Sequence, residues 1–106
     1  MSRIAESQGT PIRAIECVPI VLGLIPQLTS RWETALYESL SPPTLYGLMS
    51  CAVSYAMERL LCEDVRALKR VADVSESLLV QGDEEVREAV VIGFLEGLAV
   101  AARTKH

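Results

Sequence analysis

The chain has 106 residues, of which 50% are hydrophobic and 23% are charged, and its formal net charge is −4 at pH 7. A chain of this length suits one domain, and such a domain buries enough apolar surface to fold without disulfides or structural metals. The acidic balance argues against nucleic-acid binding, because contacts to phosphates need clustered lysine and arginine.

Residues 1–9 are polar and lack the apolar core of a signal peptide. We expect them to form a flexible N-terminus in front of a single helical domain that spans residues 10–106. The three cysteines, Cys17, Cys51 and Cys62, match no zinc or redox spacing and lie among apolar residues. We interpret them as buried free thiols, which together with the N-terminus predict a cytoplasmic protein.

The first predicted helix begins near residue 10, with Thr10 as its N-cap and Pro11 at its first position. Pro19 interrupts the apolar pattern that follows, so the sequence leaves open whether this helix is kinked there or restarts. Pro26 ends it or begins the next element. The spacing of Ser30 and Glu33 is that of a capping box and predicts a short second helix.

Two adjacent prolines within residues 41–44 (SPPT) predict a break before the third helix. Residues 45–61 then carry the cleanest amphipathic pattern in the chain. The stripe contains small and sulfur-containing side chains, which could line a cofactor groove, but we interpret it as core packing. In residues 63–79 one predicted core face comprises Val65, Leu68, Ala72, Ser75, Leu78 and Leu79, and the solvated side comprises Arg66, Lys69, Arg70, Asp73 and Glu76.

A short turn separates the last two helices, which predicts an antiparallel hairpin. Gly82 can adopt the left-handed conformation that ends a helix, and Asp83 can cap the next one. Residues 84–103 then present two faces. The predicted core face comprises Val86, Ala89, Val90, Gly93, Phe94, Gly97, Leu98 and Ala101; the outer face comprises Glu85, Glu88, Ile92, Glu96, Ala99 and Arg103.

The apolar stretch 89–102 is too short to span a membrane, and Glu96 lies near its middle. Gly93 and Gly97 therefore predict a close approach of two helices within the protein and not a transmembrane dimer. Since no useful run of alternating residues occurs, the predicted fold is all-α: a compact bundle of four to five short antiparallel helices that ends in a helical hairpin.

Catalytic signatures are missing from the sequence. The single histidine, His106, is the last residue, which argues against histidine-based catalysis and metal sites, and no phosphate-binding loop occurs. Paired acids such as Glu63–Asp64 are interpreted as helix caps and dipole partners. We therefore expect a non-enzyme without cofactor or metal.

The final block of the chain carries a family resemblance. Its matching residues are Leu78, Leu79, Gly82, Asp83, Glu84, Glu85, Val86, Arg87, Phe94, Leu95, Glu96 and Leu98. This pattern resembles a family of small, uncharacterised all-helical bacterial domains that share a leucine pair, a Gly-Asp turn and a Phe-Leu-Glu-x-Leu ending. The resemblance extends over residues 13–98, but its specific part is the last third, and the SPPT break departs from the single proline expected there.

Proteins similar to this family occur among immunity proteins encoded beside bacterial polymorphic toxins. The resemblance thus implies a protein that binds one cognate toxin and blocks it, and the acidic ridge of the last helix predicts that the surface of this toxin is basic. Under this hypothesis the partner-binding residues are Glu85, Glu88 and Glu96 on the acidic ridge, together with Tyr46. The alternative is a homodimerising or assembly-forming helical domain, which the high apolar content favours.

Overall fold

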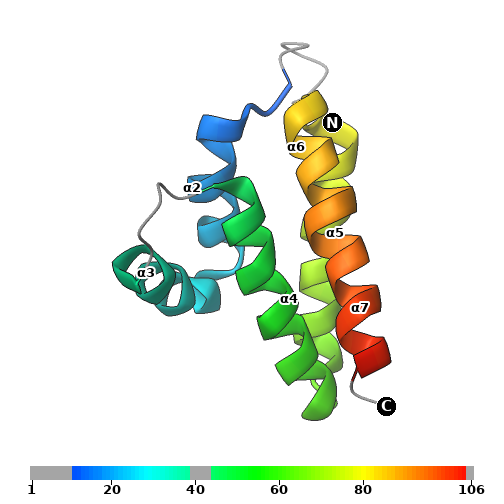
Figure 1. Ribbon diagram of the computed structural model, residues 1–106. Coiled ribbons are helices and arrows are strands. Elements are labelled where there is room, and N and C mark those ends of the chain that lie inside the picture. The colour runs from blue at the N-terminus through cyan, green and yellow to red at the C-terminus, as the bar shows by residue number, and fades with distance from the viewer. Residues whose placement is uncertain (1–10, 39–43, 105–106) are drawn as a thin grey trace.

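The computed structural model describes residues 11–38 and 44–104 (Figure 1). Within these ranges the chain is helical and forms no strand, so the prediction of an all-α bundle is confirmed. The predicted flexible segment 1–9, Thr10, the two prolines of the SPPT break and His106 lie outside the described residues. The elements are α2 (Ala14–Leu24), the 3₁₀ turn η1 (Pro26–Leu28), α3 (Thr29–Glu38), α4 (Leu45–Leu61), α5 (Val65–Gln81), α6 (Glu84–Glu88), the π-helical segment η2 (Ala89–Leu95) and α7 (Glu96–Thr104).

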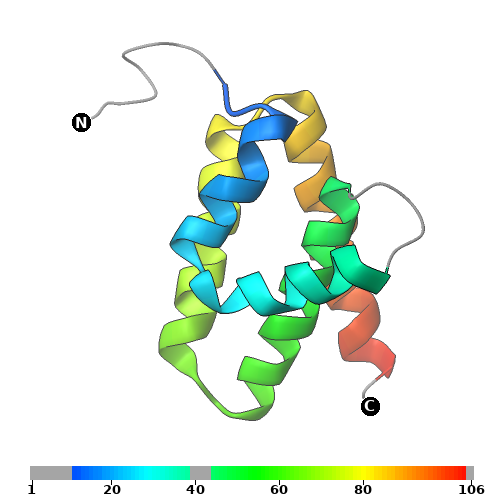
Figure 2. The ribbon, with the colours of Figure 1, turned by 90° about the vertical axis from the view of Figure 1, so that its left-hand side faces the viewer.

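Three long helices lie side by side and form most of the bundle (Figure 1). They are α4, α5 and a C-terminal helix, a name we use for α6, η2 and α7, which follow one another without a break. Helix α5 runs opposite to both of its neighbours, and it forms the predicted hairpin with the C-terminal helix. Helix α2 packs on α4 and α6, and Figure 2 shows α3 crossing α4 at a steep angle.

Helix α2 is continuous through Pro19, which is exposed and lies inside the helix. It begins later than predicted, because Ile12 adopts an extended pairing with the turn before α6. The Ile12 amide donates to the Gln81 carbonyl at 2.7 Å, and the Asp83 amide donates to the Ile12 carbonyl at 2.8 Å. The prediction that Pro11 opens the helix was therefore wrong: its start is marked by the Glu16 carboxylate, which accepts from the Arg13 amide at 3.0 Å.

Pro26 begins η1, which leads directly into α3. Ser30 consequently lies inside the helix and does not cap it, contrary to the prediction from its spacing with Glu33. Three other helices have side-chain caps: Thr44 caps α4, Asp64 caps α5 and, as predicted, Asp83 caps α6.

Two turn residues adopt conformations that the sequence did not indicate. Gly82 is extended (φ −75°, ψ 156°) and not left-handed. It must be glycine for lack of space, since a Cβ atom there would lie 2.5 Å from both the Leu78 carbonyl oxygen and Val86 Cγ1. The left-handed residue is instead Glu63 (φ 58°), in the turn between α4 and α5.

The core lies where α2, α4, α5 and the C-terminal helix meet. Its fully buried side chains include Ile25, Leu28, Leu48, Val86 and Val90. Trp32 is also buried. Of the cysteines, Cys17 and Cys51 are buried as predicted, but Cys62 is exposed.

The core face of α5 overlaps the predicted one but is rotated from it: Leu78 is buried and Leu68 and Leu79 pack against the core as predicted. Val71, Val74 and Leu78 are its buried residues, whereas Val65 and Ala72 are exposed. The exposed positions of Arg66 and Arg70 agree with the predicted solvated side.

The C-terminal helix buries the face that its sequence predicts. Val86, Val90, Phe94 and Leu98 recur every fourth residue, and a straight α-helix with 3.6 residues per turn would rotate this row away from α4. The η2 segment holds more residues per turn and therefore keeps the row on the core. The two glycines allow the predicted close approach: a Cβ atom at Gly93 would lie 2.9 Å from Met49 Cβ, and one at Gly97 would lie 3.1 Å from Val53 Cγ2.

Candidate functional site

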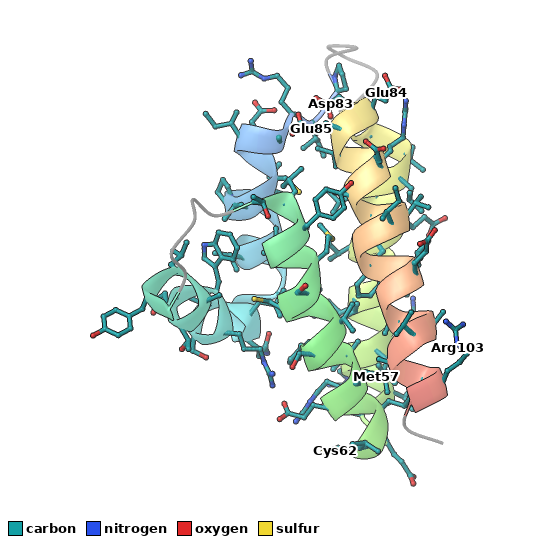
Figure 3. The ribbon with its side chains drawn as sticks, viewed as in Figure 1. Met57, Cys62, Asp83, Glu84, Glu85 and Arg103 are labelled. Carbon is teal, nitrogen blue, oxygen red and sulfur yellow. The ribbon has the colours of Figure 1, made fainter. Side chains whose placement is uncertain are left out.

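The predicted acidic ridge is exposed along the C-terminal helix. Glu85, Glu88 and Glu96 all face solvent, as do Ile92, Ala99 and Arg103. The ridge is nevertheless not one straight stripe, because the wider turns of η2 rotate α7 relative to α6. Figure 3 shows the result: Glu85 lies on the side of α2, and Arg103 lies on the opposite side of the helix.

Exposed aliphatic side chains are interspersed with these acids. Val91, Ile92, Leu95 and Val100 are each 41–50% exposed. The solvent face of the C-terminal helix therefore combines negative charge with apolar surface.

Tyr46 and Glu85 are brought together on one groove. Tyr46 is 45% exposed at the start of α4, and its ring lies over Gly93. The groove has a volume of about 600 Å³ and runs between α2, the start of α4 and α6; its walls are mostly apolar and include Ile15, Val18 and Leu45. Glu88 and Glu96 do not line this groove, so the predicted binding residues fall into two neighbouring groups.

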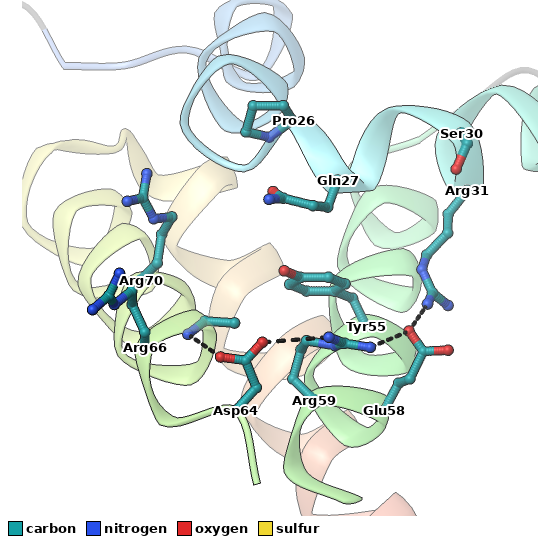
Figure 4. Close-up of a pocket in the computed structure, with 11 residues that line it drawn as sticks. Pro26, Gln27, Ser30, Arg31, Tyr55, Glu58, Arg59, Asp64, Arg66 and Arg70 are labelled. Atoms are coloured by element: carbon teal, nitrogen blue, oxygen red, sulfur yellow. Dashed lines mark hydrogen bonds and ion pairs between the residues drawn. The ribbon is translucent and has the colours of Figure 1, made fainter. Parts of the chain in front are cut away.

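A second concave site lies on another face, between η1, α3, α4 and α5 (Figure 4). We call it the arginine pocket, and its volume is about 590 Å³. Arginines from three helices line it: Arg31 from α3, Arg59 from α4, and Arg66 with Arg70 from α5. Its remaining lining residues are Pro26, Gln27, Ser30, Tyr55, Glu58, Asp64 and Ala67.

Ion pairs hold one wall of the arginine pocket in place. The Glu58 carboxylate pairs with Arg31 and, at 3.4 Å, with Arg59. Arg59 Nη1 also donates to Asp64 at 3.3 Å, and this carboxylate caps α5 through its other oxygen. Both cations also lie near the Tyr55 ring, with each guanidinium carbon 5.8 Å from the ring centroid. These contacts fix α3, the end of α4 and the start of α5 relative to one another.

The wall formed by Arg66 and Arg70 on α5 carries positive charge with no carboxylate partner among the described residues. Four arginines and two carboxylates line the pocket, which leaves an excess of two positive charges. Among the described residues Arg66 forms no ion pair, and the hydrogen bond of Arg70 goes to the Leu24 carbonyl at 3.4 Å. Figure 4 shows both side chains on the α5 side of the pocket, across from the Tyr55 ring and the Gln27 amide.

Sequence reasoning did not find this pocket. It placed Arg66 and Arg70 on a solvated helix face and attached no role to Arg31 or Arg59. The one available signal was the i,i+4 spacing of Arg66 and Arg70, which puts two like charges on the same side of a helix. Their convergence with two arginines from other helices depends on the tertiary fold.

The described residues contain no group of three or more histidine, cysteine or acidic side chains that could hold a metal ion. None of the helices in the described ranges combines the length and the apolar character needed to cross a membrane.

Comparison with known proteins places the chain in a family but assigns it no activity. Searches of curated proteins and of solved structures find no match. A family described as a domain of unknown function, DUF7674, matches residues 18–106, which is most of the chain and includes all of its described helices except the first residues of α2. The chain therefore belongs to the DUF7674 family.

Proposed function

We propose that this protein is a binding module that neutralises a cognate bacterial toxin by covering it, in the manner of an immunity protein. It acts in the cytoplasm of the producing cell or of its sister, and it makes and breaks no covalent bond. The observation that supports the proposal is the solvent face of the C-terminal helix, where Glu85, Glu88 and Glu96 are exposed among aliphatic side chains.

Each group of residues has a separate task in this proposal. The carboxylates attract a basic toxin surface, which speeds association and selects the partner by charge complementarity. The half-exposed Tyr46 ring and the apolar groove beside it supply the anchor, because aromatic side chains in desolvated pockets carry much of the affinity of an interface. Glu85 lies on both surfaces and joins them into one interface.

The test is the affinity for the toxin encoded beside this gene, measured with purified proteins. The triple variant Glu85→Gln, Glu88→Gln and Glu96→Gln should weaken binding about tenfold or more, mainly through slower association. The matched control, Glu33→Gln, Glu63→Gln and Glu76→Gln, removes the same charge from exposed positions on other elements and should bind nearly as well as the wild type. Equal weakening by both triple variants would refute the assignment of the surface, and a wild-type protein that does not bind the toxin would refute the function.

A second candidate function is homodimerisation, and the exposed aliphatic residues of the C-terminal helix favour it. Val91, Ile92, Leu95 and Val100 would be covered by a second copy of the chain. Light scattering over a range of concentrations separates this candidate from the first. A dimer that Ile92→Glu dissociates would support self-association, and a monomer at the highest concentration would rule it out.

A further inference from the structure

We propose that the arginine pocket binds a small organic anion through its phosphate or carboxylate groups. The pocket lies on α3, α4 and α5, and none of the residues assigned to toxin binding lines it. This proposal is therefore independent of the proposed function.

The distribution of charge is the first argument. The chain has ten basic residues against fourteen acids, yet four arginines line one concavity with only two carboxylates. Gathering like charges costs free energy. Glu58 and Asp64 neutralise the wall formed by Arg31 and Arg59, but Arg66 and Arg70 have no such partner among the described residues. An anion bound between the two walls would supply the missing negative charge.

The donors in the pocket are the second argument. A guanidinium group offers paired N–H donors that match two oxygens of a phosphate or a carboxylate. Besides Arg66 and Arg70, the Tyr55 hydroxyl, the Gln27 amide and the Ser30 hydroxyl lie on the same pocket. No acceptor in the described part of the chain takes a hydrogen bond from these three polar groups, which leaves them available to a ligand.

The third argument is the rigidity of the wall formed by Arg31 and Arg59. Partial burial lowers the pKa of the Arg59 guanidinium, but its hydrogen bond to Asp64 and the nearby negative groups outweigh this effect, so that its pKa lies above the ordinary value. Arg59 thus stays charged and fixed by Asp64 and Glu58 beneath the Tyr55 ring. Because this wall is already held in place, it loses little conformational entropy when a ligand binds.

The size of the pocket indicates the class of ligand. Its volume of about 590 Å³ suits a small organic molecule and exceeds what a single inorganic ion would fill. Phosphate esters and polycarboxylates share the required chemistry, and probes of each kind can distinguish them.

Isothermal titration of the full chain at constant ionic strength tests the proposal, with pyrophosphate as the phosphate probe and citrate as the carboxylate probe. We expect at least one of them to bind with a dissociation constant below about 1 mM. Binding of pyrophosphate alone would point to phosphate compounds, binding of citrate alone to polycarboxylates, and binding of both to the shared chemistry.

Substitutions locate the site. The double variant Arg66→Gln and Arg70→Gln should weaken binding about tenfold or more, since it removes the charge-assisted donors of one wall. Tyr55→Phe should weaken it several-fold while keeping the ring near Arg31 and Arg59. The matched control, Arg87→Gln and Arg103→Gln, removes two exposed arginines from the C-terminal helix and should leave the affinity unchanged.

Three results would overturn the proposal. The first is that neither probe binds the wild type at concentrations up to about 10 mM, a range in which even weak specific sites are detected. The second is undiminished binding by the Arg66 and Arg70 double variant. The third is equal weakening by the control, which would indicate a general charge effect.

Discussion

Adding one methyl group to a helix should have opposite effects at two glycines of this protein. Gly93 lies where the C-terminal helix touches α4, and a Cβ atom there would be 2.9 Å from Met49 Cβ and 3.1 Å from Tyr46 Cδ1. Met49 Cβ is fixed to the backbone, so α4 would have to move. Gly23 lies in α2, and a Cβ atom there would meet nothing within 4 Å.

The magnitudes follow from two competing terms. Alanine is favoured over glycine in a helix interior by about 1 kcal/mol, and by less near a helix end such as position 23. Overpacking a closely packed contact costs about 1–3 kcal/mol. We therefore expect Gly23→Ala to stabilise the fold by about 0.5 kcal/mol and Gly93→Ala to destabilise it by about 1 kcal/mol. Gly97→Ala should fall between them, because its contact at 3.1 Å is with the end of the Val53 side chain.

Urea unfolding followed by circular dichroism measures these differences. With a slope of about 1 kcal/mol per molar urea, the midpoints of the Gly23→Ala and Gly93→Ala variants should differ by roughly 1.5 M. If Gly93→Ala stabilised the protein as much as Gly23→Ala, the close approach of α4 and the C-terminal helix would be refuted.

Three further predictions concern the α4–α5 turn and the cysteines. Glu63→Gly should stabilise the fold by about 0.5–1 kcal/mol in the same urea assay, since glycine adopts the left-handed conformation of this residue without strain; a loss of stability would contradict the turn geometry. Burial, and secondarily the charge of Asp83, raises the pKa of the Cys17 thiol from 9.0 to about 11, so the folded state holds this proton more tightly than the unfolded state. This difference adds to the free energy of unfolding in full below pH 9.0. As the pH rises from 9.0 to 11, the free energy of unfolding should fall by about 2 kcal/mol, and Cys17→Ala should show a smaller fall over the same range. A thiol reagent at pH 8 should modify Cys62 rapidly and leave the buried Cys17 and Cys51 unmodified until the protein unfolds; rapid modification of all three would contradict the core.

The local rules of helix formation predicted much of this fold. The core face of the C-terminal helix and the cap at Asp83 follow from spacing and hydrogen-bonding capacity alone. Where prediction failed, contacts distant in sequence were responsible. Ile12 pairs with the turn at Gly82, which delays the start of α2 and leaves no space for a side chain at that glycine.

The face of α5 shows the same limit. Two overlapping apolar rows occur on this helix, and the row through Val71, Val74 and Leu78 is buried because of how α4 and the C-terminal helix pack against it. Both rows are present in the sequence, and the sequence pattern alone does not indicate which of them is buried.

The candidate surfaces were predictable to different degrees. Exposure of Glu85, Glu88 and Glu96 follows from the amphipathic pattern, whereas the groove that unites Tyr46 with Glu85 depends on the position of α2. The arginine pocket combines side chains from α3, α4 and α5 that are spaced irregularly along the chain, so that no local pattern indicates it.

The central claim of the proposed function is tested most directly by titrating the cognate toxin that it requires, with toxin activity as the readout. A protein that acts by covering its target should abolish toxin activity at a fixed stoichiometric ratio, with linear inhibition up to that ratio. Complete neutralisation by a small fraction of an equivalent would require turnover and would contradict the account, as would full toxin activity in the presence of excess protein.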